Sequence, residues 1–341
     1  MNDDLENLRL PSTSRSMHII GSEMEAPGRL GNRIFQAALA RRIAEESGYH
    51  TVFSGFDPSP FFPNMDISDR PSLSSIRELD KFECNSQDFS SLRSDFEDSK
   101  FDALLLKGWG TRLENVVGLK DELVKNVESL KLNHRRIGAD EVLVVVRCGE
   151  TAGERPIHPD YFPLPVSFYE KVFRRVKRKP VFFGQLDCHS YVDTLKSAFP
   201  GESFIPGTNP LYDFETIRRA RMKVLPISTF AWLAAWTGSA DTQIIMPVAG
   251  AYNPVQRSDW NLLPLDDSRY FFYFFDQRRW ERNVSLDNHL HALRTASLGF
   301  PRIPSGAEWQ FLLSFRLLAV IASWLRSARA HLPKLKRPSR D

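Results

Sequence analysis

The sequence predicts an α/β protein with two doubly wound domains, a cleft between them and a helical tail at its C-terminal end. Three observations lead to this fold class. The chain has 341 residues, enough for two domains that each bury a core. Short apolar runs alternate with segments of helical period in both halves, the pattern of parallel sheets covered by helices. Hydrophobic residues make up 42% and charged residues 26%, as in ordinary soluble proteins.

The first domain is expected over residues 17–139, after a disordered lead at 1–16. Phe35, Leu39 and Ile43 recur every four residues in its first helix, and Gly48 ends that helix. Residues 57–102 are rich in Ser, Asp and Pro, which predicts an irregular, partly mobile insertion. The elements expected are strands at 18–21, 49–54 and 103–106, and helices at 33–47 and 116–130.

The second domain is expected over residues 140–290, followed by a C-terminal amphipathic helix and basic tail at 291–341. It opens with an apolar, β-branched run at 142–146, which is typical of a strand buried on both faces of a parallel sheet. The alternation that follows again predicts a doubly wound sheet. The further elements expected are strands at 180–183, 222–226 and 242–247, and helices at 165–176, 189–198, 213–221 and 229–236.

The net charge of +3 is unevenly distributed. From Phe311 onward the chain has seven Lys or Arg and one acid, a net +6, so the rest of the chain carries −3. A slightly acidic body with a basic tail argues against a nucleic-acid partner, because nucleic-acid grooves need positive charge across the fold.

The basic tail follows an apolar segment, 311–325, whose only polar residues are Arg316 and two serines. The segment is too short to span a bilayer, which takes ~20 apolar residues. Arg316 and Ser323 share one helical face, so the helix is expected to lie in the interface of an anionic membrane through 311–340. The alternatives are a helix packed on the domains or a dimer contact.

Residues 1–16 lack the apolar core of a secretory signal, and three cysteines are too few for a disulfide framework or a zinc site. These observations predict a cytoplasmic protein, peripheral on the inner face of the cell membrane.

Three segments carry chemistry. The first, GRLGNRIF at 28–35, lies where a strand turns into a helix; Gly31 and Asn32 there allow backbone approach to an anionic ligand. The alternative is a tight turn with Asn32 as helix N-cap. The second is Arg147, at the carboxyl end of the 142–146 strand, where open α/β sheets place ligands. An arginine there can pair with a diphosphate and stabilise the leaving group; the alternative is a surface arginine.

The third segment is ISTFAWLAAW at 227–236. Ser228 and Thr229 stand at the start of an apolar helix, where hydroxyls, backbone N–H groups and the helix dipole favour a phosphate. The alternative is ordinary capping of a buried helix by one of the two hydroxyls. Trp232 and Trp236 are four residues apart and are expected in the core.

In combination and in order over 17–247, these segments resemble the bacterial α-1,2-fucosyltransferases, the family 11 glycosyltransferases. The SSFSWW-AW motif of that family is the most specific match, because the Ile-Ile-Met-Pro strand that follows agrees as well. The matches, in chain order, are GGLGNQ-F-Q with GRLGNRIFQ at 28–36, a glycine–aromatic stretch with 108–110, HxRRGD with 145–150, a histidine and YY-K helix with His158 and 168–171, an acidic residue opening a helix with Asp213, and SSFSWW-AW with 228–236.

The resemblance implies a GT-B-type fold of two Rossmann-like domains, with the donor in the second and the acceptor in the first. It implies metal-independent, inverting transfer of L-fucose from GDP-fucose to a glycan or lipid-linked saccharide, with no cofactor besides the donor. The residues then expected to bind the donor are Gly31, Asn32, Arg147, Asp213, Ser228, Thr229 and Phe230.

An inverting transferase needs a base for the acceptor proton, and Glu150 or His158 would lie at the cleft rim. With Arg147 they form the expected catalytic set, although the base could also lie in the first domain.

The chain departs from the family at three motif positions, where it has Val145, Cys148 and Glu150 in place of histidine, the second arginine and aspartate. The guanine-binding region after the next strand does not align at 184–187. Another nucleotide sugar on the same fold therefore stays open, as does a non-catalytic carbohydrate-binding homologue.

Other enzyme classes lack their signatures. No strand is followed by G-x-G-x-x-G, which disfavours a dinucleotide dehydrogenase. A P-loop sequence is absent, and so is the D-x-D triplet of metal-dependent GT-A transferases. No metal site is expected.

Overall fold

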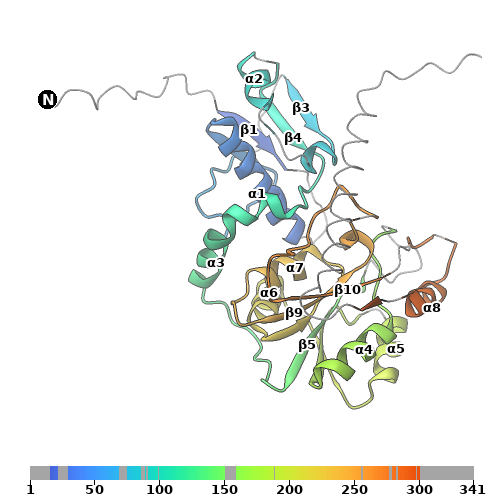
Figure 1. The fold of residues 1–341 in the computed structure, drawn as a ribbon. Coiled ribbons are helices and arrows are strands. Elements are labelled where there is room, and N and C mark those ends of the chain that lie inside the picture. The colour runs from blue at the N-terminus through green and yellow to red at the C-terminus, as the bar shows by residue number, and fades with distance from the viewer. Residues whose placement is uncertain are drawn as a thin grey trace, which may run out of the picture. The chain divides into compact units, whose positions relative to one another are not determined.

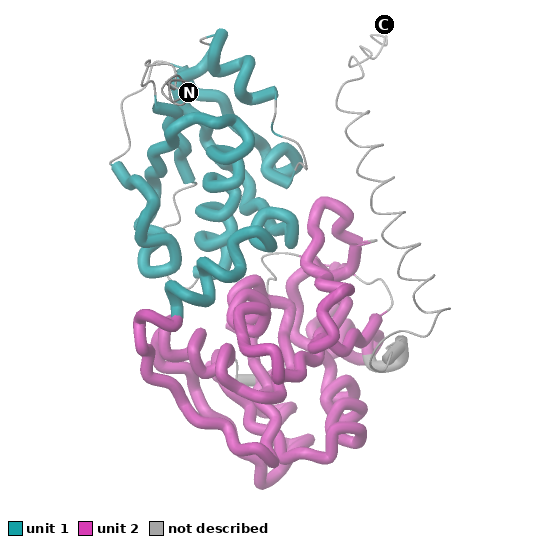
Figure 2. Tube along the Cα trace, turned by 60° about the vertical axis from the view of Figure 1, so that its left-hand side comes forward, with its two compact units in different colours: residues 1–127 teal, residues 128–341 magenta. Residues whose placement is uncertain are grey.

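The computed structural model describes residues 16–21, 30–68, 75–85, 89, 91–98, 100–149, 159–187, 189–254, 256–275, 279–281, 283–296 and 298–299. The chain divides into two compact units, residues 1–127 and 128–341 (Figure 2). The sequence pattern places this boundary after residue 139 instead. Each unit is described by itself below.

Unit 1 is built on a four-stranded sheet in the order β2-β1-β4-β3. Figure 1 labels β1, β3 and β4 of this sheet. All three pairings are parallel, as the sequence predicts for an α/β domain. Its strands are β1 (Met17–Ile20), β2 (Thr51–Ser54), β3 (Ile76–Leu79) and β4 (Ala103–Leu106). Its helices are α1 (Leu30–Ser47), α2 (Ser91–Glu97) and α3 (Lys120–Ser129), with short 3-10 turns η1 (Glu83–Asn85), η2 (Leu113–Asn115) and η3 (Val117–Leu119).

The helical period read from the sequence is confirmed in α1. Phe35, Leu39 and Ile43 are fully buried, and Gly48 follows the last turn with a positive φ of 70°. The helix begins at Leu30, three residues before the expected start, because the first turn of a helix leaves its N–H groups unpaired and so tolerates glycine and asparagine.

The interpretation of 57–102 as irregular is wrong in part, because β3, η1 and α2 lie within it. Phe96 of α2 is buried and packs edge-on against Tyr49, with 4.7 Å between the ring centroids. The sequence signal is weak because β3 is an edge strand of four residues with Ile76 40% exposed, so it lacks the apolar run of a central strand.

Unit 2 is built on a seven-stranded sheet in the order β11-β10-β9-β8-β5-β6-β7. Figure 1 labels β5, β9 and β10 of this sheet. The strands are parallel except β11, which pairs antiparallel with β10. They are β5 (Glu141–Val146), β6 (Lys179–Gly184), β7 (Ser203–Pro206), β8 (Met222–Val224), β9 (Gln243–Val248), β10 (Tyr270–Phe274) and β11 (Leu298–Gly299). The first six of these follow the 3-2-1-4-5-6 order of a Rossmann fold, so the predicted α/β class is confirmed.

The helices of unit 2 are α4 (Val166–Val176), α5 (His189–Ala198), α6 (Pro210–Arg219), α7 (Thr229–Trp236) and α8 (Leu286–Ala296). Residues 142–146 of β5 are all buried, as their apolar run predicts. Trp232 and Trp236 are buried and stack with 5.4 Å between centroids, which confirms that they belong to the core. The sequence interpretation omitted β7, β10 and α8.

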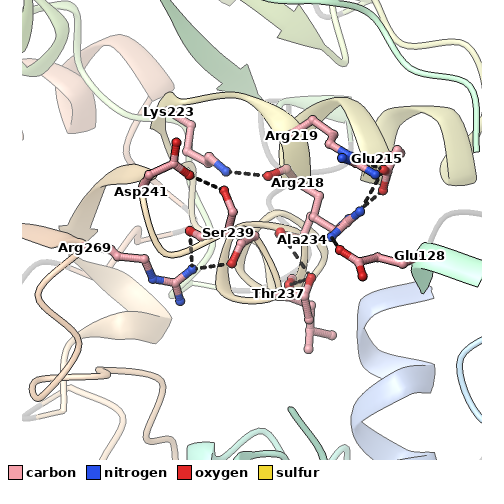
Figure 3. A network of polar contacts seen from close by, with 12 residues as sticks. Glu128, Glu215, Arg218, Arg219, Lys223, Ala234, Thr237, Ser239, Asp241 and Arg269 are labelled. Carbon is pink, nitrogen blue, oxygen red and sulfur yellow. Dashed lines mark hydrogen bonds and ion pairs between the residues drawn. The ribbon is translucent and has the colours of Figure 1, made fainter. Parts of the chain in front are cut away.

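The amino edge of this sheet holds a buried polar network (Figure 3). Lys223 of β8 donates from Nζ to the Arg218 carbonyl at the end of α6 (3.0 Å). Arg269 donates from Nη2 to the Trp236 carbonyl (2.9 Å) and from Nη1 to the Gly238 carbonyl (2.6 Å), at the end of α7. These side chains satisfy carbonyls that helix ends leave unpaired.

Candidate active site

The sheet of unit 2 reverses its direction of growth between β5 and β8. The chain adds β6 and β7 on one side of β5, and then β8, β9 and β10 on the other. Open α/β sheets bind their ligands at such a reversal, outside the carboxyl ends of the strands. The residues that follow β5 and β8 are therefore the first to consider.

Arg147 is the residue after β5 and lies at this reversal. Its Nη1 donates a hydrogen bond to Oγ of Ser228, in the turn that follows β8, over 3.2 Å. Its guanidinium also lies over the ring of Tyr161, with Cζ 5.7 Å from the centroid, within the range of a cation–π contact. The structure thus brings together two of the residues that the sequence singles out, Arg147 and Ser228.

Ser228 is the N-cap of α7. Its Oγ accepts a hydrogen bond from the Ala231 N–H (3.4 Å), so the capping alternative from the sequence is observed. Thr229 is buried in the first turn of the same helix, next to the cap. Phe230 is half-buried and packs edge-on against Phe214 of α6, 5.7 Å between centroids. The site therefore combines a helix start with an arginine held against its cap.

The turn that follows β9 holds the backbone of Ser228 in place through two hydrogen bonds. Tyr252, in η5 (Gly250–Tyr252), accepts a hydrogen bond from the Ser228 N–H (3.0 Å) and donates one to its carbonyl (2.6 Å). Burial raises the pKa of Tyr252 far above its ordinary value, so the hydroxyl keeps its proton. Gly250 has a φ of +52°, and a Cβ there would collide with the Asp160 carbonyl.

Asp213 lies elsewhere on the same edge. It belongs to the first turn of α6, whose N-cap is Asn209, and its Oδ1 accepts from the Thr208 N–H (3.0 Å) after β7. Partial burial raises the pKa of the Asp213 carboxyl. In the sheet order β7 is two strands from β5. Asp213 therefore lies at a neighbouring part of the carboxyl edge and not beside Arg147 and Ser228.

Gly31 and Asn32 belong to unit 1. Both lie in the first turn of α1, so Asn32 is not the N-cap that the sequence offers as an alternative. Gly31 is buried and Asn32 half-buried.

Several expected residues lie outside the described part of the chain: Gly28 of the first motif, both candidate bases Glu150 and His158, and the helix and basic tail at 311–340. Their predicted roles stay predictions.

The structure adds residues that sequence reasoning missed. Tyr161 and Tyr252 contact Arg147 and Ser228, and Asp160 is a fully buried carboxylate beside them. For the turn that holds Tyr252 the sequence signal is Gly250, two residues after the apolar strand β9, since a glycine there indicates a close backbone approach. Cys148, the residue after Arg147, is buried, and its Sγ lies 3.0 Å from the Gln185 carbonyl oxygen after β6.

Among the residues that the structure describes, no group of three or more His, Cys, Asp or Glu could hold a metal ion. Within the same described ranges, no helix is both long and apolar enough to cross a membrane.

No protein-family model and no curated protein matches the sequence. Some solved structures are similar to the chain. An FUT1 mutant from Arabidopsis thaliana in complex with GDP is 11% identical, with a TM-score of 0.39 over 71% of this chain and 72% of that one.

The iron-containing dodecameric glycosyltransferase TibC from enterotoxigenic E. coli is 13% identical, with a TM-score of 0.42 over 93% of this chain and 78% of its own. A family 9 glycosyl transferase from Veillonella parvula is 11% identical, with a TM-score of 0.39 over 83% and 97%. All three are glycosyltransferases. At these identities and TM-scores the likeness carries no argument about what this chain does.

Proposed function

We propose that the chain is a metal-independent, inverting glycosyltransferase that uses a nucleotide sugar, by default GDP-fucose, and acts on a glycan or lipid-linked saccharide. The observation that carries the proposal is the hydrogen bond between Arg147 and Ser228 at the strand reversal of unit 2. The two residues are 81 residues apart in the chain and come from two of the motifs that resemble the fucosyltransferases.

Arg147 and the start of α7 suit a diphosphate. A guanidinium presents a planar fork that pairs with two phosphate oxygens, and the N–H groups of a helix start attract the same charge. Negative charge grows on the diphosphate as the sugar leaves, so both groups would stabilise the transition state more than the bound donor. Ser228 and Thr229 would add hydroxyl donors, and Asp213 and Phe230 would line the same edge further out.

The acceptor side is proposed for unit 1, and Gly31 and Asn32 are proposed as residues that take part in binding the donor. Inverting transfer needs a base within hydrogen-bond reach of the acceptor hydroxyl, and Glu150 or His158 would serve. Single alanine variants of these two residues test this. Normal turnover in both would place the base elsewhere, in unit 1 for example.

Two other functions keep the same fold. Another nucleotide sugar is favoured by the departures at Val145 and at 184–187, where the family binds guanine. A non-catalytic carbohydrate-binding homologue is favoured by Cys148, because a buried cysteine stands where the family has its second arginine.

Thermal shift with GDP, UDP, CDP and dTDP identifies the nucleobase of the donor, since a ligand at a hundred times its Kd adds about 2.7 kcal/mol of stability. Transfer and hydrolysis of the matching sugar nucleotide are then measured for the wild type and for Arg147→Ala. The proposal expects activity in the wild type and its loss in the variant. Arg221→Ala is a matched control, because Arg221 lies in the same unit at the amino edge with its side chain 69% exposed.

Activity of Arg147→Ala within a few-fold of wild type would contradict the assignment of Arg147. Nucleotide binding without any transfer or hydrolysis would favour the non-catalytic homologue.

We also propose that 311–340 attaches the protein to an anionic membrane, next to its acceptor. The support is the sequence alone: an apolar segment followed by a basic run, each Lys or Arg adding about 1 kcal/mol near anionic lipid. In flotation with anionic liposomes at low salt, the full chain should rise with the liposomes, whereas a chain ending at Pro304 should stay in the soluble fraction. If both stay in the soluble fraction and truncation lowers the melting temperature, the helix packs on the protein instead.

A further inference from the structure

A second charged cluster lies next to the Arg147 site and is not used by the proposed chemistry. Its centre is Asp160, whose side chain is 0% exposed. The carboxylate accepts hydrogen bonds from Gln256 Nε2 (2.5 Å), Arg257 Nη1 (3.5 Å) and Arg279, whose Nε and Nη2 lie 3.1 and 3.4 Å away. A buried carboxylate is stable only with such partners, so Asp160 holds two loops of unit 2 together.

The backbone around Asp160 joins the same loops. The Asp160 carbonyl accepts from the Ala251 N–H (2.8 Å) in the turn after β9, and the Pro159 carbonyl accepts from the Trp280 N–H (2.9 Å) in the loop after β10. The residue after Asp160 is Tyr161, which carries the guanidinium of Arg147 over its ring. Segments after β5, β9 and β10 are thus fixed to one short stretch of chain.

The two arginines of the cluster differ in how many of their N–H groups are already hydrogen-bonded within the fold. Arg257 binds Asp259 through both Nε (2.9 Å) and Nη2 (2.7 Å), so its charge and most of its N–H groups are used within the fold. Among the residues that the structure describes, Arg279 pairs with the shared carboxylate of Asp160 alone, and its side chain is 59% exposed. In the described ranges its Nη1 has no hydrogen-bond partner.

We infer that Arg279 is a second donor-binding arginine, which contacts the β-phosphate of the donor diphosphate while Asp160 holds it in position. The inference rests on the proposed function. A diphosphate carries more charge than Arg147 alone balances, and the next residue, Cys148, is a buried cysteine that brings no positive charge. Arg279 stands at the same carboxyl edge with one side of its fork anchored and the other open, which lowers the entropy lost on binding.

The test separates the two phosphates of the nucleotide. Dissociation constants are measured by calorimetry for each nucleoside diphosphate and monophosphate of G, U, C and dT, and for pyrophosphate and phosphate. The full-length wild type is compared with Arg279→Gln, which keeps Asp160 paired with Arg257 and Gln256. Arg221→Gln is the control, an exposed arginine of the same unit that faces one aspartate at 3.8 Å.

Arg279→Gln should weaken binding of the preferred diphosphate roughly tenfold, the scale of a lost hydrogen bond to a charged group, and change the monophosphate less than about twofold. Asp160→Asn should also weaken diphosphate binding more than monophosphate binding, because a neutral amide no longer fixes the Arg279 guanidinium. Arg221→Gln should leave both constants unchanged. A general structural defect would weaken both ligands equally, so the ratio isolates the phosphate contact.

An unchanged diphosphate-to-monophosphate ratio in Arg279→Gln overturns this inference and leaves the proposed function intact, provided the wild type binds a nucleoside diphosphate. A wild type that binds neither a nucleoside diphosphate nor pyrophosphate overturns both. If Asp160→Asn does not fold, the comparison of Arg279→Gln with Arg221→Gln still decides.

Discussion

Lys223 gives the sharpest test of the structure outside the active site. Its side chain is fully buried in β8, where Nζ donates to the Arg218 carbonyl (Figure 3). Burial lowers the pKa of Lys223 to about 7, and the nearby guanidinium groups of Arg269 and Arg218 act in the same direction. We predict that Lys223→Met makes the folded state less sensitive to pH and more stable in acid.

The magnitude follows from the two pKa values of Lys223. A lysine in an unfolded chain has a pKa of about 10.4, and each unit of difference is worth about 1.36 kcal/mol, so charging the buried amine costs roughly 4–5 kcal/mol below pH 7. The folded pKa lies below the unfolded one, so the unfolded state binds more protons between pH 7 and 10.4. The free energy of unfolding therefore rises with pH through that window. From pH 6 to pH 9 the wild type should gain roughly 2–3 kcal/mol relative to Lys223→Met.

The assay is thermal unfolding of both proteins at pH 6, 7, 8 and 9. The wild type should gain roughly 5–10 °C relative to the variant over this range, because 1 kcal/mol shifts the melting temperature of a domain this size by about 2–4 °C. The variant loses one hydrogen bond, but that loss is the same at each pH, so the slope decides. Lys125→Met, at an exposed position of α3, is the control. A difference between wild type and Lys223→Met that stays constant with pH would refute the reasoning.

Three further changes test the active site. Arg147→Lys should lower kcat/KM for the sugar nucleotide more than tenfold, on the order of 1.4 kcal/mol or above, because an ammonium lacks the planar fork. Ser228→Ala combined with Thr229→Ala should weaken nucleotide binding by ~1–3 kcal/mol in calorimetry. Unchanged affinity with a lower melting temperature would leave Ser228 as a cap only. Tyr252→Phe removes both hydrogen bonds to the Ser228 backbone and should lower the free energy of unfolding in urea by roughly 1–2 kcal/mol.

The sequence predicts the central strands of both sheets well, because burial on both faces requires an uninterrupted apolar run. Residues 142–146 and 103–106 are such runs, and both are strands. β3 and β7 lie at sheet edges and are partly exposed, so neither requires an uninterrupted apolar run. β10 reads as an aromatic stretch, YFFYF, with no helix pattern beside it, so alternation alone does not reveal it.

For the active site, the sequence identifies residues whose position follows from a strand end. Arg147 and Ser228 follow β5 and β8, so their neighbourhood can be inferred once the strands are known. Asp160 and Arg279 meet only because separate loops fold onto one another, 119 residues apart, and neither stands at a fixed offset from a strand or helix pattern. Pairings of this kind depend on loop conformation, which local sequence does not specify.

The two edges of the unit 2 sheet use cations in opposite ways. At the amino edge Arg269 donates to the Trp236 carbonyl at the end of α7, where the helix dipole favours positive charge. At the carboxyl edge Arg147 lies against the N-cap of α7, where the dipole has the same sign as the guanidinium and opposes it by about 0.3–1 kcal/mol. The first arrangement stabilises the fold by itself. A diphosphate that binds both the arginine and the helix start would offset this repulsion, which is why we place the donor at the carboxyl edge and not at the amino edge.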